Sequence, residues 1–254
     1  MEKDNNKYFL DWYIKLSLDD KRLGVKQTAK EVAFIRKVLN LGHGSRLLDL
    51  CCGHGRHTID LAKNLNVTGL DLDPAALRML NHKAKLKGIK LSTLQSDMRR
   101  IPFTSQFDAS LLMYSSFGYF SDDEQNLRVL RSINNALKPG GLLLFDVKNR
   151  FLTIKNSVEL TWEERADCFI LYKYHFDEKN DLAIMDLKIL NKKTFKIQNT
   201  GFILKLYTPD QLTLMLQKTG FEVVKLFGST TEIQPFNRKS SSRLVVLARK
   251  KGVR

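Results

Sequence analysis

The stretch Arg46–Asp71 constrains the fold more than any other part of this 254-residue chain. It opens with an apolar run that ends in a turn at Gly53 and Gly55. A helical pattern of apolar residues follows, and a second apolar run ends at Asp71. This succession predicts a strand–helix–strand unit in which the first turn and the end of the second strand lie near one crevice.

The residue types at this crevice indicate a nucleoside site. Gly53 and Gly55 let the backbone turn tightly and let a ligand approach without meeting a Cβ atom. Backbone amides at the start of the following helix offer donors to polar or anionic groups. Asp71 suits a bidentate hydrogen bond to vicinal ribose hydroxyls. The unit therefore predicts a cofactor that carries a nucleoside.

The glycine spacing separates two classes of such cofactors. A dinucleotide fingerprint needs a third small residue, but Thr58 occupies that position, so an NAD-dependent enzyme is the weaker alternative. The run from Asp49 to Gly55, Asp-Leu-Cys-Cys-Gly-His-Gly, instead resembles the first motif of class I S-adenosylmethionine (SAM)-dependent methyltransferases, D/E-x-x-x-G-x-G. The resemblance covers residues 28–250 in order.

Later segments resemble the same family. Asp73 and Pro74 open a helix as N-cap and first helical residue. The resemblance implies that Leu72 offers an apolar face to adenine and that Asp97 accepts from its amino group. Cofactor contacts are accordingly expected from Asp49, Cys51, Gly53, Gly55, Asp71, Leu72, Asp97, Met98 and Met113.

The alternation of strand and helix patterns predicts an α/β fold with a parallel sheet between helices. The family resemblance makes this a Rossmann-like seven-stranded sheet whose last strand is antiparallel. Beyond the opening unit, strands are expected at 90–94, 107–113, 142–147, from 220 and at 242–248, and helices at 28–39, 74–87, 122–137 and 208–219.

Residues 151–207 interrupt this alternation. They contain β-branched and aromatic runs at 169–176, 182–190, 194–197 and 202–206, with hairpin-like turns between them. We expect residues 1–150 and 208–254 to form the SAM-binding core with an N-terminal helical cap. Residues 151–207 are expected to form a β-rich lid, which resembles the lid of small-molecule methyltransferases. A flap that forms a homodimer is the alternative and is compatible with a lid.

Charge and composition limit the partners. The chain is 43% hydrophobic and carries a formal charge of +15, with basic residues concentrated at 83–100 and in the C-terminal part. In the expected fold these two regions lie towards opposite edges of the sheet. A solvated lysine-rich surface is therefore favoured over a nucleic-acid-binding surface.

The sequence favours a cytoplasmic protein without a metal or a membrane partner. Its three cysteines provide no disulfide framework, and its N-terminus is polar, unlike a secretory signal. No apolar run approaches the roughly 20 residues that span a membrane. The four candidate metal ligands Cys51, Cys52, His54 and His57 are too closely spaced to converge on one ion.

The predicted function is methyl transfer from SAM to a small-molecule acceptor, which leaves S-adenosyl-L-homocysteine. The protein mainly aligns donor and acceptor and excludes water, and an oxygen acceptor needs a general base more readily than an amine does. Tyr114, in the aromatic loop after the fourth strand, and His175 are the candidate bases. Tyr8 and Thr28 are candidate cofactor contacts, although packing roles are favoured for both.

Two other functions remain open. The positive charge suits an RNA methyltransferase, but the loop after the fourth strand lacks the N/D-P-P-Y/F pattern of many enzymes that methylate base amino groups. A non-catalytic SAM-binding protein would keep the cofactor motifs and fill its acceptor pocket with side chains.

Overall fold

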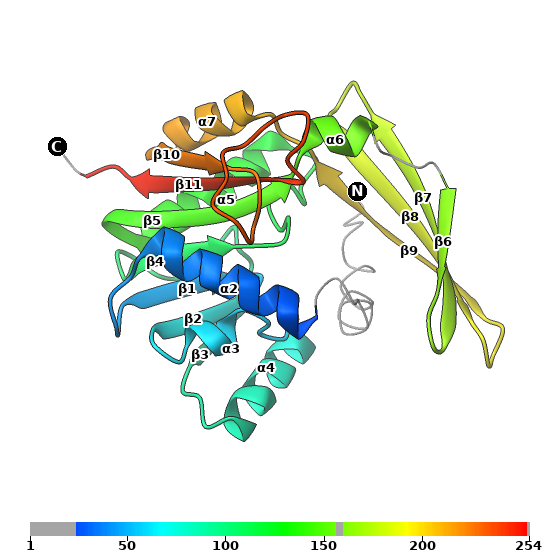
Figure 1. Ribbon diagram of the computed structural model, residues 1–254, viewed down its shortest axis with the longest axis horizontal. Helices are drawn as coiled ribbons and strands as arrows, with labels where there is room; N and C mark the ends of the chain where they lie inside the picture. Colours follow the sequence, from blue (N-terminus) through cyan, green and yellow to red (C-terminus); the bar gives the residue numbers. More distant parts are fainter. Residues whose placement is uncertain (1–23, 156–159, 253–254) are drawn as a thin grey trace.

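The computed structural model describes residues 24–155 and 160–252. Its core is a seven-stranded sheet in the order β10-β11-β5-β4-β1-β2-β3 (Figure 1). The strands of this sheet are β1 (Arg46–Leu50), β2 (Asn66–Asp71), β3 (Ser92–Gln95), β4 (Phe107–Leu112), β5 (Leu137–Lys148), β10 (Phe221–Phe227) and β11 (Arg243–Lys250).

The strand directions confirm the expected topology. β1 pairs in parallel with β2 and with β4, whereas β11 runs antiparallel to both of its neighbours, β5 and β10. The chain proceeds outwards from β1 to β3 and then returns to the other side of β1 with β4. Ligands bind at such a switch point, beyond the carboxyl ends of the strands.

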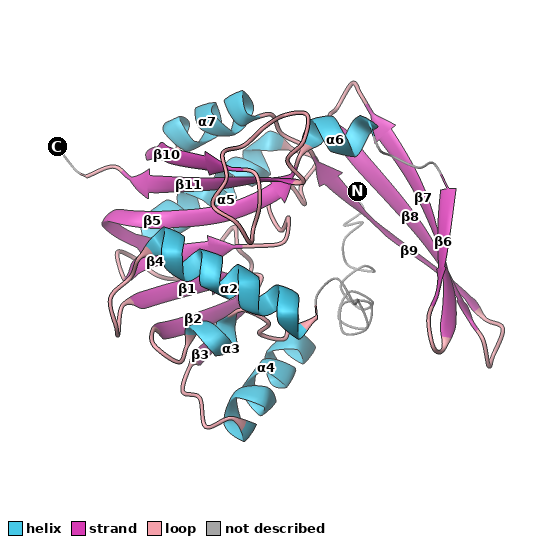
Figure 2. Ribbon diagram, in the orientation of Figure 1, coloured by secondary structure: helices cyan, strands magenta, loops and turns pink. Residues whose placement is uncertain are grey.

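Helices cover both faces of the sheet, with α2, α3 and α4 on one face and α5 and α7 on the other (Figure 2). Phe34 and Ile35 of α2 pack with Leu47 of β1, and Ile133 of α5 packs with Phe145 of β5. The helices of the core are α2 (Val25–Leu39), α3 (Thr58–Leu61), α4 (Pro74–Leu86), α5 (Asp123–Ala136) and α7 (Pro209–Lys218).

Two helix starts follow the sequence signals. The Asp73 carboxylate accepts from the Ala75 N–H at 2.7 Å, and Pro74 occupies the first turn of α4. Thr208 and Gln211 form a reciprocal capping box at the start of α7. Both helices were predicted because a cap needs only neighbouring residues.

Several boundaries differ from the expected ones. α3 is a single turn, because Asn64 and Leu65 both donate to the Leu61 carbonyl and the chain leaves the helix. α2 begins three residues earlier than expected, and β3 begins two residues later. β5 extends back to Leu137, which pairs with Phe107 of β4.

A second, four-stranded antiparallel sheet has the order β6-β7-β8-β9 and lies beyond the carboxyl ends of the parallel core strands (Figure 1). β6 and the preceding helix α6 were not predicted, and β9 is one strand where two runs were expected. The elements of this part are α6 (Arg150–Lys155), β6 (Leu160–Glu164), β7 (Cys168–Asp177), β8 (Leu182–Asn191) and β9 (Ile197–Lys205).

The second sheet is fastened to the core near the β7–β8 turn. The Arg150 guanidinium pairs with Asp181 at 2.5 Å, and the Lys205 N–H donates to the Gly118 carbonyl at 2.7 Å. Gly118 has a φ of +100°, and a Cβ atom there would lie 2.5 Å from the Lys205 carbonyl oxygen. Only glycine fits this junction without displacing β9.

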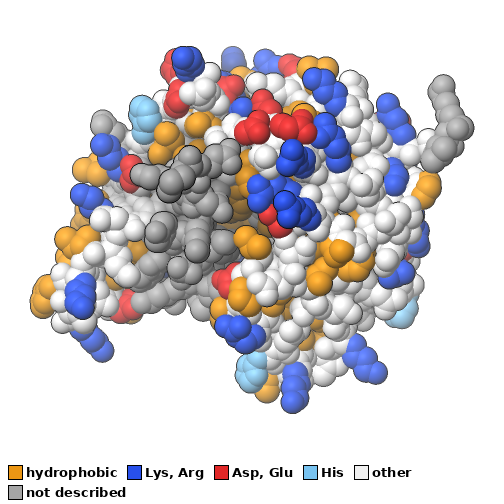
Figure 3. All heavy atoms as spheres, turned by 180° about the vertical axis from the view of Figure 1, so that it is seen from behind, with side chains coloured by type: hydrophobic (Ala, Val, Ile, Leu, Met, Phe, Trp, Pro, Cys, Tyr) orange, Lys and Arg blue, Asp and Glu red, His pale blue; other side chains and the backbone are white. Residues whose placement is uncertain are grey.

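In the described part of the chain, the two basic regions lie towards opposite edges of the sheet. The strand order places α4 beside the β3 edge and the end of β11 towards the β10 edge, as expected. Lys and Arg side chains are scattered among acidic and hydrophobic ones on the face shown in Figure 3. Across residues 24–155 and 160–252, no helix has the length and apolar character needed to cross a membrane.

Candidate active site

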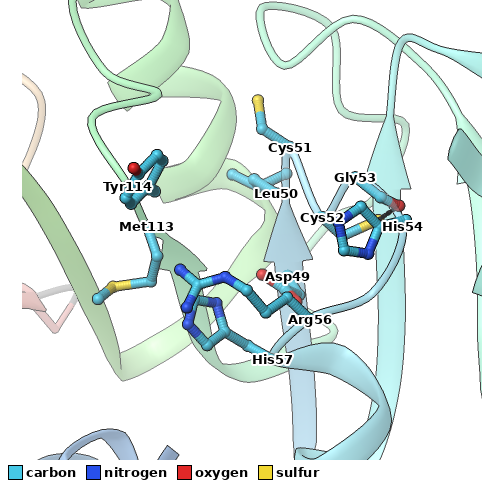
Figure 4. A pocket seen from close by; sticks show the side chains of 10 residues that line it. All are labelled: Asp49, Leu50, Cys51, Cys52, Gly53, His54, Arg56, His57, Met113 and Tyr114. Carbon is cyan, nitrogen blue, oxygen red and sulfur yellow. Dashed lines mark hydrogen bonds between the residues drawn. The ribbon is translucent and has the colours of Figure 1, made fainter. Parts of the chain in front are cut away.

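A pocket lies at the carboxyl end of β1, where the glycine loop leads into α3 (Figure 4). Met113 and Tyr114, from the end of β4, lie on one side of it, and Gly53 and His54 lie on the other. The lining residues are Asp49, Leu50, Cys51, Cys52, Gly53, His54, Arg56, His57, Met113 and Tyr114.

The two glycines of the loop have different roles. Both have left-handed backbones, with φ of +55° at Gly53 and +83° at Gly55. A Cβ atom on Gly55 would lie 2.2 Å from Leu80 Cδ1, so this glycine allows α4 to pack closely. A Cβ atom on Gly53 would meet nothing within 4 Å, so this glycine faces open space. Gly53 is therefore the position where a ligand can approach the backbone.

Asp71 connects the glycine loop to the end of β2. Its carboxylate accepts from the Gly53 N–H at 2.7 Å and from the Asp73 N–H at 2.9 Å. Burial raises the pKa of Asp71, and these backbone N–H groups oppose the rise. A carboxylate has about four lone-pair sites, so acceptor capacity remains for a ligand hydroxyl. Leu72, the next residue, is 49% exposed.

Asp97 and Met98 follow β3 at the same end of the sheet. The Asp97 carboxylate accepts from the Arg99 backbone N–H at 2.8 Å and from its guanidinium at 2.5 Å. Burial raises the pKa of Asp97, but the Arg99 hydrogen bonds outweigh it and hold the pKa below its usual range. Buried Met98 has its Sδ atom 3.7 Å from the Cys51 Sγ atom. The structure thus joins this segment to the glycine loop.

Asp49 is a buried connection between β1 and α3. It is 2% exposed and accepts from the Thr58 hydroxyl at 2.6 Å. Burial raises the pKa of Asp49. The position that excludes the dinucleotide fingerprint, Thr58, thus supports the motif aspartate and fixes the start of the helix.

His54 contributes a neutral imidazole to the pocket. Burial and the nearby Lys83 ammonium lower the pKa of His54 to about 4. Its Nδ1 atom therefore accepts from Lys83 Nζ, 3.0 Å away on α4. This contact ties the middle of the glycine loop to the helix that packs beside it.

A charged cluster that the sequence analysis missed lies on the α2 side of the pocket. Glu31 of α2 is 4% exposed. It pairs with Arg56 and with His57, whose Nε2 atom lies 2.8 Å away. Thr28, a predicted cofactor contact, lies within 3.4 Å of Arg56 Nη1. The one sequence signal for this cluster was the adjacent Arg56 and His57 after the glycines. Their partner, Glu31, lies 25 residues before Arg56.

A second pocket adjoins the first, and Arg56, His57, Met113 and Tyr114 line both. It has about 760 Å³ of empty space, including its open mouth. Its other lining residues come from α2, the end of β5, the start of β11 and the segment before β11: Gln27, Glu31, Asp146, Thr230, Ser242 and Arg243.

Asp71, Leu72, Asp97 and Met98 lie at the same end of the sheet but do not line either pocket. His175 is exposed on β7 and is absent from the lining of both pockets, so a catalytic role for it stays a prediction. Tyr8 lies outside the described residues. Among residues 24–155 and 160–252, no three His, Cys, Asp or Glu side chains are grouped so that they could hold a metal.

Comparisons with known proteins agree with this geometry. Residues 47–141 match the family model described as a methyltransferase domain. A putative methyltransferase of Bacillus subtilis, YqeM, is 27% identical over 83% of this chain and 86% of its own length. The cypemycin N-terminal methyltransferase of a Streptomyces species is 26% identical over 81% of this chain and 84% of its own.

Solved structures share the fold. An S-adenosylmethionine-dependent methyltransferase from Clostridium acetobutylicum has a TM-score of 0.79 at 19% identity. The match covers 97% of this chain and 99% of the Clostridium protein. The sugar N-methyltransferase KedS8 from a Streptoalloteichus species has a TM-score of 0.68 at 19% identity. The match covers 95% of this chain and 92% of KedS8. Residues 47–141 thus form a methyltransferase domain, and the sheet order and motif agree with the fold of SAM-dependent methyltransferases.

Proposed function

We propose that this enzyme transfers the methyl group of SAM to a small polar acceptor bound in the second pocket. The observation that carries the proposal is the shared wall of Arg56, His57, Met113 and Tyr114. A cofactor in the first pocket and an acceptor in the second would meet at this wall. Proximity of that kind supplies much of the acceleration in a two-substrate reaction.

The first pocket and the neighbouring ends of β2 and β3 together fit SAM. Gly53 leaves open space beside the backbone, and the buried Asp71 carboxylate has lone pairs available for the ribose hydroxyls. Leu72 offers an exposed apolar side chain for adenine, and Asp97 and Met98 border the same end. When bound, SAM supplies a methyl group activated by the positive charge of its sulfonium. Asp49 and Cys51 would shape the floor, and Met113 the methyl-bearing side.

The lining of the second pocket favours a polar acceptor. It carries two acid–arginine pairs, Glu31 with Arg56 and Asp146 with Arg243, together with hydroxyl and amide groups. Among the described residues that line it, Met113 is the one non-aromatic apolar side chain. A long apolar acceptor would leave these polar groups without partners, which is costly. The likeness to a sugar N-methyltransferase supports an amine as the nucleophile.

The second sheet is proposed as a lid. It lies beyond the carboxyl ends of the parallel core strands (Figure 1). Residues at these ends line both pockets. Its attachment through Asp181 and Lys205 leaves the far end of the sheet away from the core. A lid there would exclude water from the aligned reactants. In this division, residues 151–207 form the lid, and residues 1–150 and 208–254 form the core.

We also propose the cytoplasm as the compartment. Cys51, Cys52 and Cys168 are free thiols, and burial keeps the last of them from solvent. Free thiols without disulfides are typical of reducing compartments.

The test is a transfer assay with tritiated SAM and a panel of acceptors: amino sugars, amino acids, phenols, an isoprenoid quinone and transfer RNA. The proposal predicts labelled product with a polar small molecule, and an amine in particular. Label only in the quinone would contradict the polar pocket, and label only in transfer RNA would favour an RNA methyltransferase. Tight SAM binding without any transfer would favour a non-catalytic protein.

A further inference from the structure

The loop after β4 adopts a backbone that its residues disfavour. Tyr114 and Ser115 have consecutive left-handed φ values of +66° and +60°, and neither is glycine. Residues with a Cβ atom keep this conformation only when the surrounding structure enforces it. Such residues concentrate at functional sites, and Tyr114 lines both pockets.

Two residues from distant strands hold this loop in place. Asp146, at the end of β5, is fully buried, and its Oδ1 atom accepts from the Tyr114 N–H at 2.5 Å. Arg243, at the start of β11, donates from Nε to Asp146 Oδ2 at 2.7 Å. The same guanidinium donates from Nη2 to the Ser115 hydroxyl at 2.6 Å. Each left-handed residue is therefore fixed by one member of the Asp146–Arg243 pair.

The pair also sets the position of the Tyr114 ring. The Arg243 guanidinium carbon lies 5.8 Å from the ring centroid, and that of Arg56 lies 5.4 Å from it. The ring thus contacts two cations, and each cation is paired to a buried carboxylate, that of Asp146 or that of Glu31. Cation–π contacts of this kind are strongest where water is excluded.

We propose that Asp146 and Arg243 are positioning residues for methyl transfer, which hold Tyr114 as the wall between the cofactor and acceptor pockets. The inference rests on the proposed function. The pair acts through Tyr114 and does not touch the reacting atoms. A displacement of about 1 Å in a positioning group can cost roughly 100-fold in rate, so a fixed wall matters for a reaction that depends on alignment.

The test measures SAM affinity by calorimetry, and stability by thermal unfolding, for Arg243→Met, Tyr114→Leu and the double variant Arg243→Met/Tyr114→Leu. The matched control is Arg249→Met, which removes another arginine of β11 whose pair with Glu222 is 3.9 Å long and half exposed. A purely structural role would lower the unfolding temperature and leave SAM affinity unchanged.

The inference predicts that Arg243→Met and Tyr114→Leu each weaken SAM binding at least about threefold, and that the double variant is scarcely weaker than Tyr114→Leu alone. Arg249→Met is expected to bind SAM as the wild type does. Wild-type affinity in Arg243→Met, or effects that simply multiply in the double variant, would overturn the inference.

Two further controls keep the test decisive. If Arg243→Met does not fold, Asp146→Asn replaces it in the cycle, because asparagine keeps an oxygen for the Tyr114 N–H and loses the charge that holds Arg243. Non-additive effects of Asp146→Asn and Tyr114→Leu on SAM affinity would then support the inference, and effects that simply multiply would overturn it. If the wild type itself does not bind SAM, the proposed function fails, and this result is distinct from a wild type that binds SAM without coupling to Arg243.

Discussion

Glu31 is expected to make the stability of this protein depend on pH in the acidic range. Its carboxylate is almost fully buried and is held by His57, Arg56 and Gln27. Burial raises the pKa of Glu31, but the hydrogen bonds and charges of His57 and Arg56 outweigh it and lower the pKa from 4.5 to about 2. Folding therefore favours the ionised form.

The sign and size of the effect follow from this difference. Because the pKa is lower in the folded state, the stabilisation is fully present above about pH 4.5 and is lost as the pH falls towards about 2. The difference between the two pKa values corresponds to a contribution on the order of 3 kcal/mol. Replacing Glu31 with Gln also leaves Arg56 and His57 buried beside a neutral group, which adds to the cost.

The assay is urea unfolding of the wild type and Glu31→Gln between about pH 3 and pH 8. The wild type is expected to be more stable by on the order of 3 kcal/mol at neutral pH, and the gap is expected to narrow below about pH 4.5. Glu124→Gln is the control, because Glu124 is exposed and its pair with Arg131 is screened by solvent. A difference in unfolding free energy between the wild type and Glu31→Gln that stays constant from about pH 3 to pH 8 would contradict a lowered pKa of Glu31.

Three further outcomes are expected. Gly118→Ala places a Cβ atom 2.5 Å from a backbone carbonyl of β9 at a φ of +100°, so thermal unfolding is expected to show a loss of more than about 1 kcal/mol; an unchanged midpoint would contradict it. Tyr207→Phe removes the bond from a buried hydroxyl to Asp123 at 2.8 Å and is expected to cost about 1–2 kcal/mol in chemical denaturation, whereas a neutral result would mean that water replaces it. Burial raises the pKa of the Cys51 and Cys52 thiols. Iodoacetamide is therefore expected to label them slowly at neutral pH until denaturant is added, as followed by mass spectrometry. Fast labelling of the folded protein would contradict a raised thiol pKa.

Local signals in the sequence predicted much of the core. The caps at Asp73 and Thr208 each need only residues within the next turn, so both helix starts were recognised. The turn at Gly53 was recognised for the same reason, since its left-handed backbone suits glycine. The antiparallel last strand came from the family resemblance rather than from any pattern in residues 243–250.

The charged clusters could not be predicted in this way. Asp146 and Arg243 are 97 positions apart and meet because β11 inserts beside β5. Glu31 meets Arg56 and His57 because α2 packs against the sheet beside α3. Nothing in the local sequence at either carboxylate signals its partner. His175 was predicted as a candidate base from its residue type alone, and the structure places it on an exposed face of β7, away from both pockets, so its role stays a prediction.

The most direct test of the central claim is calorimetric titration of the wild type and of Asp71→Ala with SAM, with NADH as the comparison ligand. The account predicts saturable SAM binding to the wild type, strongly weakened SAM binding to Asp71→Ala, and no binding of NADH. The two bonds from Gly53 and Asp73 to Asp71 connect the glycine loop to the end of β2, where we propose that the ribose binds. No SAM binding by the wild type, or equal affinity in the variant, would contradict the placement of the cofactor at the ends of β1 and β2.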